Sequence, residues 1–399
     1  MGDAGAVRGP DGSGGSSAGA PEPTGVLIVG AGPAGLATAA CLKRAEVPYI
    51  LLERGERVGW AWHNHYERLR LHTVKEHSAL PFLPFPDETP RYPSRQQVAD
   101  YLERYARELE LRPRFGQDVT RLARRDGRWQ AETAAGQRYV ADAVVVASGY
   151  NRAANTPSWP GQERFRGRLL HSAEYRSGAE FRGQRVLVVG IGNTGAEIAL
   201  DLAEQGAYPT IAVRGGVNII PRDVRGRPAQ VTNIRLLWLP SRVRDVVGRL
   251  MSRLTFGDLS RYGLRPLPYG PVTQIERHGR LPVIDVGTVE RVKRGEIAVA
   301  PGPARFTETG VVFTDGVERP FDAVVLATGY RPALSDFLEG AAAVVDPRGY
   351  PAGDGATGVP GLYFLGFARP KAGILRQIGL EARAVAAEVA EYVRGAGPR

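Results

Sequence analysis

The sequence predicts an α/β protein with two doubly wound, Rossmann-like domains, one of them inserted into the other. Two observations carry this prediction. Apolar runs at 26–29 and 186–189 each lead into a G-x-G-x-x-G pattern that opens a helical segment. In addition, two similar apolar segments, at 142–150 and 322–330, end in small residues, as expected where a chain crosses between two sheets.

The other elements follow in chain order. After the first glycine pattern we expect a helix to residue 44 and a strand at 49–52, and after the second a helix to residue 204 and a strand at 210–213. Further strands are predicted at 129–132, 139–147, 311–313 and 322–327, and a closing helix at 374–394. The expected division is a disordered tail at 1–24, a first domain in two parts at 25–155 and 323–399, and an inserted domain at 156–322.

The two glycine patterns predict two dinucleotide sites. Their glycines allow a tight turn and a close approach of the backbone to a pyrophosphate, which lies at the N-terminus of the next helix. One such pattern is a weak signal. Two in one chain, each between a strand and a helix, imply two dinucleotides that exchange electrons.

The residue after the second strand of each unit distinguishes the two dinucleotides. Glu53 follows 49–52, and a carboxylate there accepts hydrogen bonds from a ribose 2′-hydroxyl, so the first site favours FAD. Arg214 ends the corresponding strand of the second unit, where a guanidinium matches a 2′-phosphate, so the second site favours NADPH. The alternative for Arg214 is a solvated surface charge. The domain at 25–155 and 323–399 is therefore the expected FAD domain, and 156–322 the expected NADPH domain.

Composition narrows the class of protein. The 399 residues carry a net charge of +10, but the basic residues are dispersed and no nucleic-acid-binding module is visible, so we expect no nucleic-acid partner. Cys41 is the single cysteine, which excludes an intrachain disulfide and dithiol chemistry and favours a cytoplasmic setting. Its expected role is core packing.

No membrane span is expected, because no apolar run reaches about 18 residues. The segment 234–254 combines apolar residues with four arginines and is a candidate for a helix that lies on a lipid surface. Pro240 interrupts it, and we favour a helix that packs between domains.

With these features in place, the chain resembles the class B flavin-dependent monooxygenases. Their identifying pattern F-x-G-x-x-x-H-x-x-x-Y/F appears from Phe165 to Tyr175, with His171 in its centre, just before the second glycine pattern. Within that family the sequence is most similar to the YUCCA group, which converts indole-3-pyruvate to indole-3-acetate. The similar segments include 68–72, 80–86, 92–97, 190–197, 213–223, 282–287, 327–331 and 361–367.

The resemblance implies a chemistry. NADPH reduces FAD, the reduced flavin takes up dioxygen as a flavin peroxide, and one oxygen atom enters a small-molecule substrate. The implied substrate is an aromatic 2-oxo acid such as indole-3-pyruvate, which loses its carboxyl group. The alternatives are oxygenation of an amine or sulfide, or an electron-transfer reductase that serves a protein acceptor. The residues do not indicate an oligomeric state.

His72 is the candidate catalytic residue. Many amine- and sulfide-oxidising members carry Asn at this position, just before a Lys-Glu pair, whereas here His72 precedes Lys75-Glu76. Histidine changes charge near neutral pH, so it is able to influence the protonation of a reacting oxygen. A structural histidine beneath the flavin is the equal alternative.

Other histidines give weaker signals. His63 and His65 lack a third ligand, so a loop role near Trp62 is expected and no metal site. His171 is expected to fix the hinge between the domains. The candidate cofactor-binding residues are Gly30, Gly32, Pro33, Ala34, Gly35, Glu53, Arg54, Trp62, His72, Val119 and Gly329, together with Gly190, Gly192, Asn193, Thr194, Gly195 and Arg214. Val119 is included because this fold offers a backbone group to the adenine there.

Overall fold

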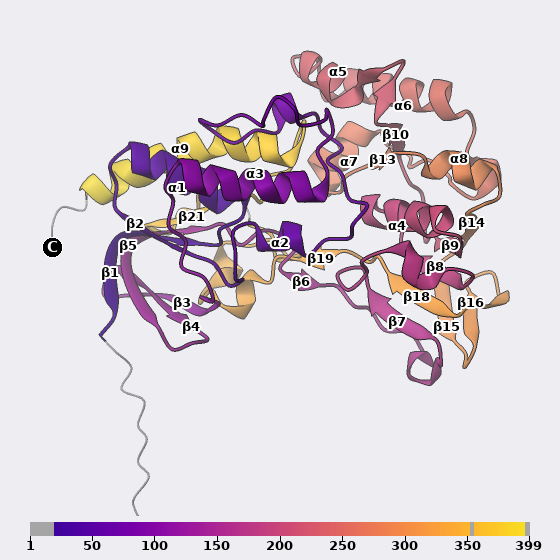
Figure 1. Cartoon of the computed structure of the whole chain (residues 1–399), viewed down its shortest axis with the longest axis horizontal. Coiled ribbons are helices and arrows are strands. Elements are labelled where there is room, and N and C mark those ends of the chain that lie inside the picture. Colours follow the sequence, from indigo (N-terminus) through magenta and orange to yellow (C-terminus); the bar gives the residue numbers. More distant parts are fainter. Residues whose placement is uncertain (1–19, 352–354, 396–399) are drawn as a thin grey trace, which may run out of the picture.

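Two sheets, side by side, organise the chain (Figure 1). The structure is a computed structural model that describes residues 20–351 and 355–395. Most of the expected tail at 1–24 therefore lies outside the described residues. Residues 22–24 already belong to the first strand, where they pair with 139–141, so the first domain begins earlier than expected.

The first sheet has seven strands and forms the left half of Figure 1. Its order is β2-β1-β5-β21-β20, with parallel pairing from β2 to β21, and an antiparallel meander of β3 and β4 joins it through β5. The strands are β1 (Glu22–Val29), β2 (Tyr49–Leu52), β3 (Val119–Arg125), β4 (Arg128–Thr133), β5 (Arg138–Val146), β20 (Gly355–Ala356) and β21 (Leu362–Phe364).

Helices cover one face of this sheet, and the meander covers the other. The covering helices are α1 (Pro33–Arg44), α3 (Arg95–Glu108) and α9 (Ile374–Gly395), and a short helix α2 (Trp60–His63) lies at its edge. Pro33 opens α1, where its missing N–H costs nothing, and Ser94 caps α3 with Gln97 in a capping box. Cys41 is buried in the core beneath α1, as expected.

The second sheet is fully parallel, in the order β14-β9-β8-β18-β7. Its strands come between those of the first sheet in the sequence, which confirms the inserted architecture. They are β7 (Arg168–His171), β8 (Arg185–Val189), β9 (Tyr208–Ala212), β14 (Ala298–Ala300) and β18 (Ala323–Leu326). The helices of this half are α4 (Asn193–Glu204), α5 (Ala229–Arg235), α6 (Ser241–Phe256), α7 (Pro271–His278) and α8 (Thr288–Lys293).

Four smaller sheets complete the fold. Three are two-stranded pairs and one is an antiparallel triplet: β6 (Ala153–Ala154) with β19 (Tyr330–Arg331), β10 (Ile219–Pro221) with β13 (Val283–Asp285), β11 (Asp223–Val224) with β12 (Arg227–Pro228), and β15 (Pro303–Phe306), β16 (Gly310–Phe313) and β17 (Glu318–Pro320). The β6–β19 pair joins the two crossings between the halves, as the similarity of 142–150 and 322–330 predicted.

The expected boundary after residue 322 differs from the structure. Strand β18 lies between β8 and the edge strand β7, in the interior of the second sheet, so the chain returns to the first half only after Leu326. The reason is that this buried apolar strand completes the parallel pairing before the chain leaves the sheet.

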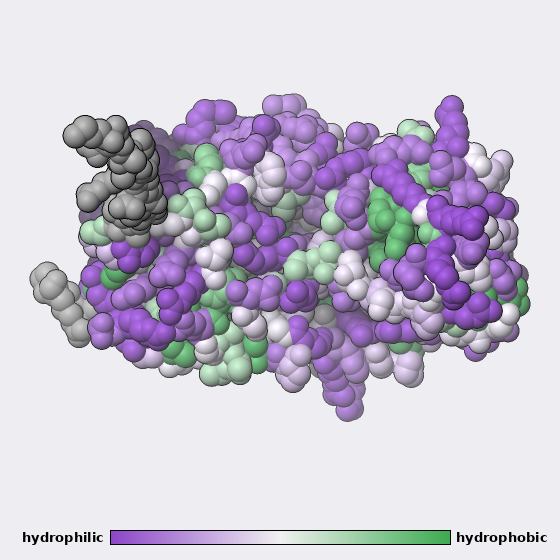
Figure 2. All heavy atoms as spheres, turned by 90° about the horizontal axis from the view of Figure 1, so that it is seen from below, coloured by the Kyte–Doolittle hydropathy of each residue, from purple (hydrophilic) through white to green (hydrophobic). Residues whose placement is uncertain are grey.

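The segment 234–254 is not one helix. It contains the end of α5, a turn closed by Pro240, and most of α6. Within the described residues, no helix is long and apolar enough to cross a membrane. Figure 2, which views the molecule from below Figure 1, shows a face that is mostly hydrophilic, with hydrophobic residues in a few separate groups.

Candidate active site

The first glycine pattern forms a loop whose backbone conformation and close contacts only glycine allows. Gly30 has a φ of +108°, and a Cβ there would lie 2.7 Å from the carbonyl oxygen of Ala147. At Gly35 a Cβ would lie 1.8 Å from the oxygen of Gly30, so the close contact between helix and loop excludes any side chain. At Gly32 an added Cβ meets no atom within 4 Å, so the space above the N-terminus of α1 is open. An open space at free N–H groups fits a pyrophosphate.

The second glycine pattern repeats this geometry. Gly190 has a φ of +110°, and a Cβ at Gly195 would lie 2.0 Å from the oxygen of Gly190. At Gly192 an added Cβ again meets nothing within 4 Å, above the N-terminus of α4. Asn193 accepts a hydrogen bond from the N–H of Ile284 at 2.7 Å, which ties the start of α4 to β13. Both sites therefore fit the same chemical group.

The Glu53 carboxylate holds the first glycine loop. Its oxygens accept hydrogen bonds from the N–H of Ala31 at 2.7 Å and of Gly55 at 2.9 Å. Each carboxylate oxygen has two lone pairs, so capacity for a ribose hydroxyl remains. The ribose contact of Glu53 stays a prediction.

Two cavities lie along these loops. One, of about 210 Å³, adjoins the first glycine loop, and the other, of about 380 Å³, lies between the two halves of the molecule. We call the second the junction cavity. Six residues line both cavities and so mark the place where they meet: Trp62, His65, Tyr150, Asn151, Ile374 and Leu375.

The structure brings most of the sequence-predicted residues to these cavities. The smaller cavity is lined by Gly30, Gly32, Pro33, Ala34, Glu53, Arg54, Trp62 and Val119. The junction cavity is lined by Trp62, His72, Asn193 and Thr194. Gly35, Gly190, Gly192 and Gly195 line neither and shape the loops behind the cavities.

Two predicted residues lie away from both cavities. Arg214 is exposed just beyond the end of β9, beside the turn at Gly302, and its guanidinium has no hydrogen bond or ion pair within the described residues. Gly329 lies in the second crossing between the halves, where its carbonyl oxygen accepts a hydrogen bond from the N–H of Asn155 at 2.9 Å. Contact of Arg214 and of Gly329 with a cofactor stays a prediction.

His72 is paired with a buried carboxylate from the other half of the molecule. Its Nε2 lies 2.7 Å from Oε1 of Glu197, one turn into α4, and the side chain of Glu197 is only 3% exposed. This contact does not meet hydrogen-bond geometry, so it is a close approach of the two side chains and not a directed hydrogen bond. The other ring nitrogen, Nδ1, has no hydrogen-bond partner within the described residues.

The pair belongs to an acidic face of α4 that holds the segment from 66 to 72. Burial raises the pKa of Tyr66 well above its ordinary value, and the charge of Glu197 together with a hydrogen bond to it adds to this. Two turns further along, Glu204 accepts two hydrogen bonds from Arg68, both at 2.9 Å. The helix that begins at the second glycine loop thus positions the segment that carries His72.

Sequence reasoning missed Glu197, Tyr66 and the role of His65. The signal for Glu197 was available, because a glutamate among apolar residues on the buried side of a helix requires a partner. His65 lines both cavities, and burial, with the charge of Arg176 as the next cause, lowers its pKa to about 4. It is therefore neutral at physiological pH. Residues 63–66 carry no pattern that predicts this.

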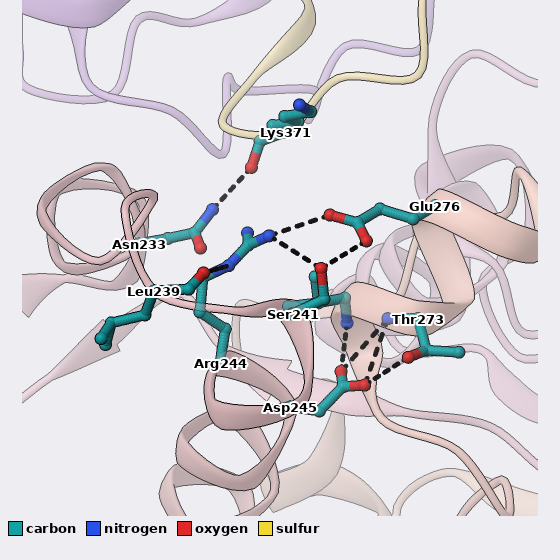
Figure 3. A network of polar contacts seen from close by, with 9 residues as sticks. Asn233, Leu239, Ser241, Arg244, Asp245, Thr273, Glu276 and Lys371 are labelled. Carbon is teal, nitrogen blue, oxygen red and sulfur yellow. Dashed lines mark hydrogen bonds and ion pairs between the residues drawn. The ribbon is translucent and has the colours of Figure 1, made fainter.

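A polar network connects α6 and α7, the two helices that cover the junction cavity and form what we call its roof (Figure 3). The buried Arg244 of α6 donates hydrogen bonds to Glu276 of α7 at 2.9 Å and to the carbonyl oxygen of Leu239 at 3.2 Å. Asp245 accepts from the N–H of Val272 and from Thr273, which fixes the start of α7. The roof is therefore braced from within.

The segment of the identifying pattern is structural. His171 accepts a hydrogen bond from the N–H of Ala173 on Nδ1, so Nε2 carries the proton and donates to the carbonyl oxygen of Gly329 at 3.1 Å. Tyr175 donates to Asp201 of α4 at 2.6 Å. The bond from His171 reaches the second crossing between the halves, whereas the bond from Tyr175 lies within the second half. The hinge role of His171 stays a prediction. The described residues hold no group of three or more His, Cys, Asp or Glu arranged around a metal.

Comparisons with known proteins agree with this geometry. The profile of the flavin-binding monooxygenase-like family matches residues 24–349. An indole-3-pyruvate monooxygenase of Oryza sativa subsp. japonica, YUCCA1, is 41% identical over 350 residues, which cover 86% of each chain. YUCCA6 of Arabidopsis thaliana, also an indole-3-pyruvate monooxygenase, is 39% identical and covers 87% of this chain and 86% of its own. The solved flavin-containing monooxygenase of Stenotrophomonas maltophilia is 28% identical, with a TM-score of 0.73 over 93% of this chain and 99% of its own.

Proposed function

The chain belongs to the flavin-binding monooxygenase-like family, and we propose that it uses FAD and NADPH to decarboxylate an aromatic 2-oxo acid oxidatively. Membership makes it a flavin-dependent monooxygenase, as the resemblance predicted. The substrate proposal rests on the indole-3-pyruvate monooxygenases, which are similar to this chain over most of both lengths.

The lining of the junction cavity is the structural observation that supports the proposed substrate class. Its walls are largely apolar, with Leu69, Leu71, Leu236, Met251 and Ile275 among them, which suits an aromatic ring. Cationic side chains also line it. Arg222 is already paired with Asp223 at 3.0 Å, whereas the side chains of Arg70 and Lys371 form no ion pair within the described residues and are free to attract a carboxylate. Among the described residues, Glu197 is the only acidic side chain that lines it, and it lies 2.7 Å from Nε2 of His72.

We assign the two dinucleotides to the two glycine loops. FAD would lie on the loop from Gly30 to Gly35, with Glu53 at its ribose and Val119 near its adenine. NADPH would lie on the loop from Gly190 to Gly195, with Arg214 at its 2′-phosphate. When bound, NADPH supplies a hydride and the flavin supplies the dioxygen chemistry. The single cysteine supports a reducing, cytoplasmic setting.

The chain's own contribution is to position groups and exclude water. Trp62, Tyr150 and Leu375 close the place where the two cavities meet, and a dry site protects reactive oxygen species from water. His72 places Nε2 against Glu197, which leaves Nδ1 as the nitrogen able to meet a ligand in the cavity. Glu197 therefore fixes the orientation of the His72 ring, and the proposed role of His72 depends on that orientation.

A substrate panel tests this function. Purified protein is loaded with FAD and supplied with NADPH, dioxygen and, in turn, indole-3-pyruvate, phenylpyruvate, a tertiary amine and a thioether. We expect the acid shortened by one carbon from each 2-oxo acid, identified by mass spectrometry, with one NADPH consumed per product. An oxygenated amine or thioether without the shortened acid would overturn the substrate class. Electron transfer to a protein acceptor without any oxygenated product would overturn the reaction itself.

A further inference from the structure

The outer face of α6 carries an exposed apolar stripe. Val243, Val246, Leu250 and Leu254 recur every three to four residues and therefore share one face of the helix. Val246 is 65% exposed and Leu254 is 77% exposed. Trp238, in the turn before α6, is 80% exposed. Soluble proteins rarely leave such residues in a continuous row, and exposed rows of this kind mark contact surfaces.

A row of arginines runs beside the stripe. Arg242, Arg249 and Arg253 recur at seven and four residues and lie on the adjoining face of α6. The guanidinium groups of Arg242 and Arg253 form no hydrogen bond or ion pair within the described residues. That of Arg249 donates to the carbonyl oxygen of Pro268 at 2.8 Å.

Within the described residues, α6 itself carries no exposed acid. The only acidic residue from 229 to 257 is Asp245, which is buried against the start of α7. Asp258, in the turn after α6, is exposed, and hydrogen bonds to Ser260 lower its pKa, with the charges of Arg261 and Arg253 as further causes. The surface formed by α6 and its preceding turn is therefore apolar and positively charged together. We call it the α6 surface.

We propose that the α6 surface docks this protein on an anionic lipid surface. An interfacial helix has this composition, with apolar side chains entering the acyl boundary and adjacent arginines meeting the headgroups. Charge also disfavours a second copy of the chain as the occupant. A symmetric contact would bring two sets of the same arginines together with no exposed acid on the helix to pair with them.

The inner face of the same helix gives the docking a consequence for the site. Val247 and Met251 line the junction cavity, and Arg244 braces the roof of that cavity through Glu276. A docked α6 surface would therefore place the roof of the cavity at the membrane, where apolar aromatic compounds concentrate. This inference does not depend on which substrate is oxidised.

Vesicle binding tests the proposal. Full-length protein loaded with FAD is sedimented with vesicles of phosphatidylcholine alone and of phosphatidylcholine mixed with phosphatidylglycerol. We expect binding to the mixed vesicles only, weakened by added salt. Changing Arg242 and Arg253 to Gln should lower the partition coefficient about fivefold for each arginine. Changing Leu250 and Leu254 to Asp should abolish binding.

Matched controls separate this surface from general charge and hydrophobicity. Leu380→Asp changes an exposed leucine on α9, and Arg305→Gln an exposed arginine on β15, and both should leave vesicle binding unchanged. Oxidase activity without vesicles shows that each variant is folded. Absence of binding to mixed vesicles, equal binding to neutral vesicles, or binding that survives the α6 changes would each overturn the proposal. So would a dimer in sedimentation that the Leu250 and Leu254 changes convert to a monomer.

Discussion

Nε2 of His72 lies 2.7 Å from Oε1 of Glu197, although the two residues belong to different halves of the molecule. Glu197 is almost fully buried, and a buried carboxylate needs a partner to offset the loss of its hydration. The pair thus links the helix that begins at the second glycine loop to the segment that lines the junction cavity.

The first prediction concerns the stability of this pair. His72→Ala leaves the Glu197 carboxylate buried without the imidazole that lies 2.7 Å from it, which should lower the free energy of unfolding by about 1–3 kcal/mol. Adding Glu197→Gln removes the charge that caused the loss, so the double variant should be more stable than His72→Ala alone. Urea unfolding of the two variants and the wild type, all in the same cofactor state, measures this. A double variant no more stable than His72→Ala would show that the carboxylate is satisfied elsewhere.

The second prediction uses the matched glycines of the two loops. An added side chain at Gly32 or Gly192 meets no protein atom near its Cβ, so Gly32→Val and Gly192→Val should both fold. The side chain would instead occupy the space of the pyrophosphate. We expect Gly32→Val to lose FAD, and Gly192→Val to keep FAD while its KM for NADPH rises.

Flavin absorbance after gel filtration and NADPH titration measure the two effects. Gly35→Ala serves as the contrast, because its Cβ would lie 1.8 Å from the oxygen of Gly30 and should disturb folding itself. Full flavin occupancy in Gly32→Val would contradict the assignment of the first loop.

The third prediction concerns Arg214. If its guanidinium binds the 2′-phosphate, Arg214→Ala should weaken NADPH binding by about 1.5–3 kcal/mol, which is one to two decades in affinity, and leave NADH unchanged. The exposed, unpaired position of Arg214 beyond β9 leaves it free for such a contact. Steady-state kinetics with both nucleotides give the ratio. An unchanged preference would mean that another cation binds the phosphate.

Local sequence patterns were enough to predict the two glycine loops, the strands beside them and the inserted architecture. Gly30 and Gly35 must be glycine for reasons confined to one loop, so their pattern is readable in a single sequence. The contact between His72 and Glu197 is different, because it exists only after both halves have packed. The roof of the junction cavity is similar in this respect, since the contact of Arg244 with Glu276 joins two helices that carry no motif.

The boundary after residue 322 was wrong for a related reason. The sequence at 322–327 predicts a buried strand but does not indicate which sheet this strand joins. Its pairing with β7 and β8 depends on strand order, which is a property of the whole second half.

The fourth prediction concerns pH. Burial lowers the pKa of His65 to about 4 from an ordinary value of 6.5, with the charge of Arg176 as a further cause. Between these values the unfolded chain binds more protons than the folded one, so the free energy of unfolding should fall as the pH drops from about 6.5 to 4. The contribution of His65 to this loss is about 3 kcal/mol.

His65→Gln removes this group and should flatten the pH dependence over that window. The exposed His278→Gln controls for the loss of one histidine. Urea unfolding at a series of pH values measures the slope. A slope in His65→Gln equal to that of the wild type would show that His65 gains a proton in the folded state as readily as in the unfolded state.

The fifth prediction concerns the carboxylate of the substrate. Lys371 lines the junction cavity, and Asn233 of α5 donates a hydrogen bond to its carbonyl oxygen at 2.6 Å, so the backbone is held (Figure 3). Its ammonium group has no ion pair or hydrogen bond within the described residues and is available to a ligand. Lys371→Ala should therefore raise the KM for a 2-oxo acid about tenfold, the lower end for a charge-assisted bond in a partly solvated site.

Lys371→Arg should restore most of the lost affinity for the acid, and Lys293→Ala, on α8, should leave the KM unchanged. The KM for NADPH should stay constant in all three variants. If it rises with that of the acid, Lys371 binds a phosphate of the nucleotide, and if neither changes, the carboxylate is bound by Arg70 or Arg222 instead.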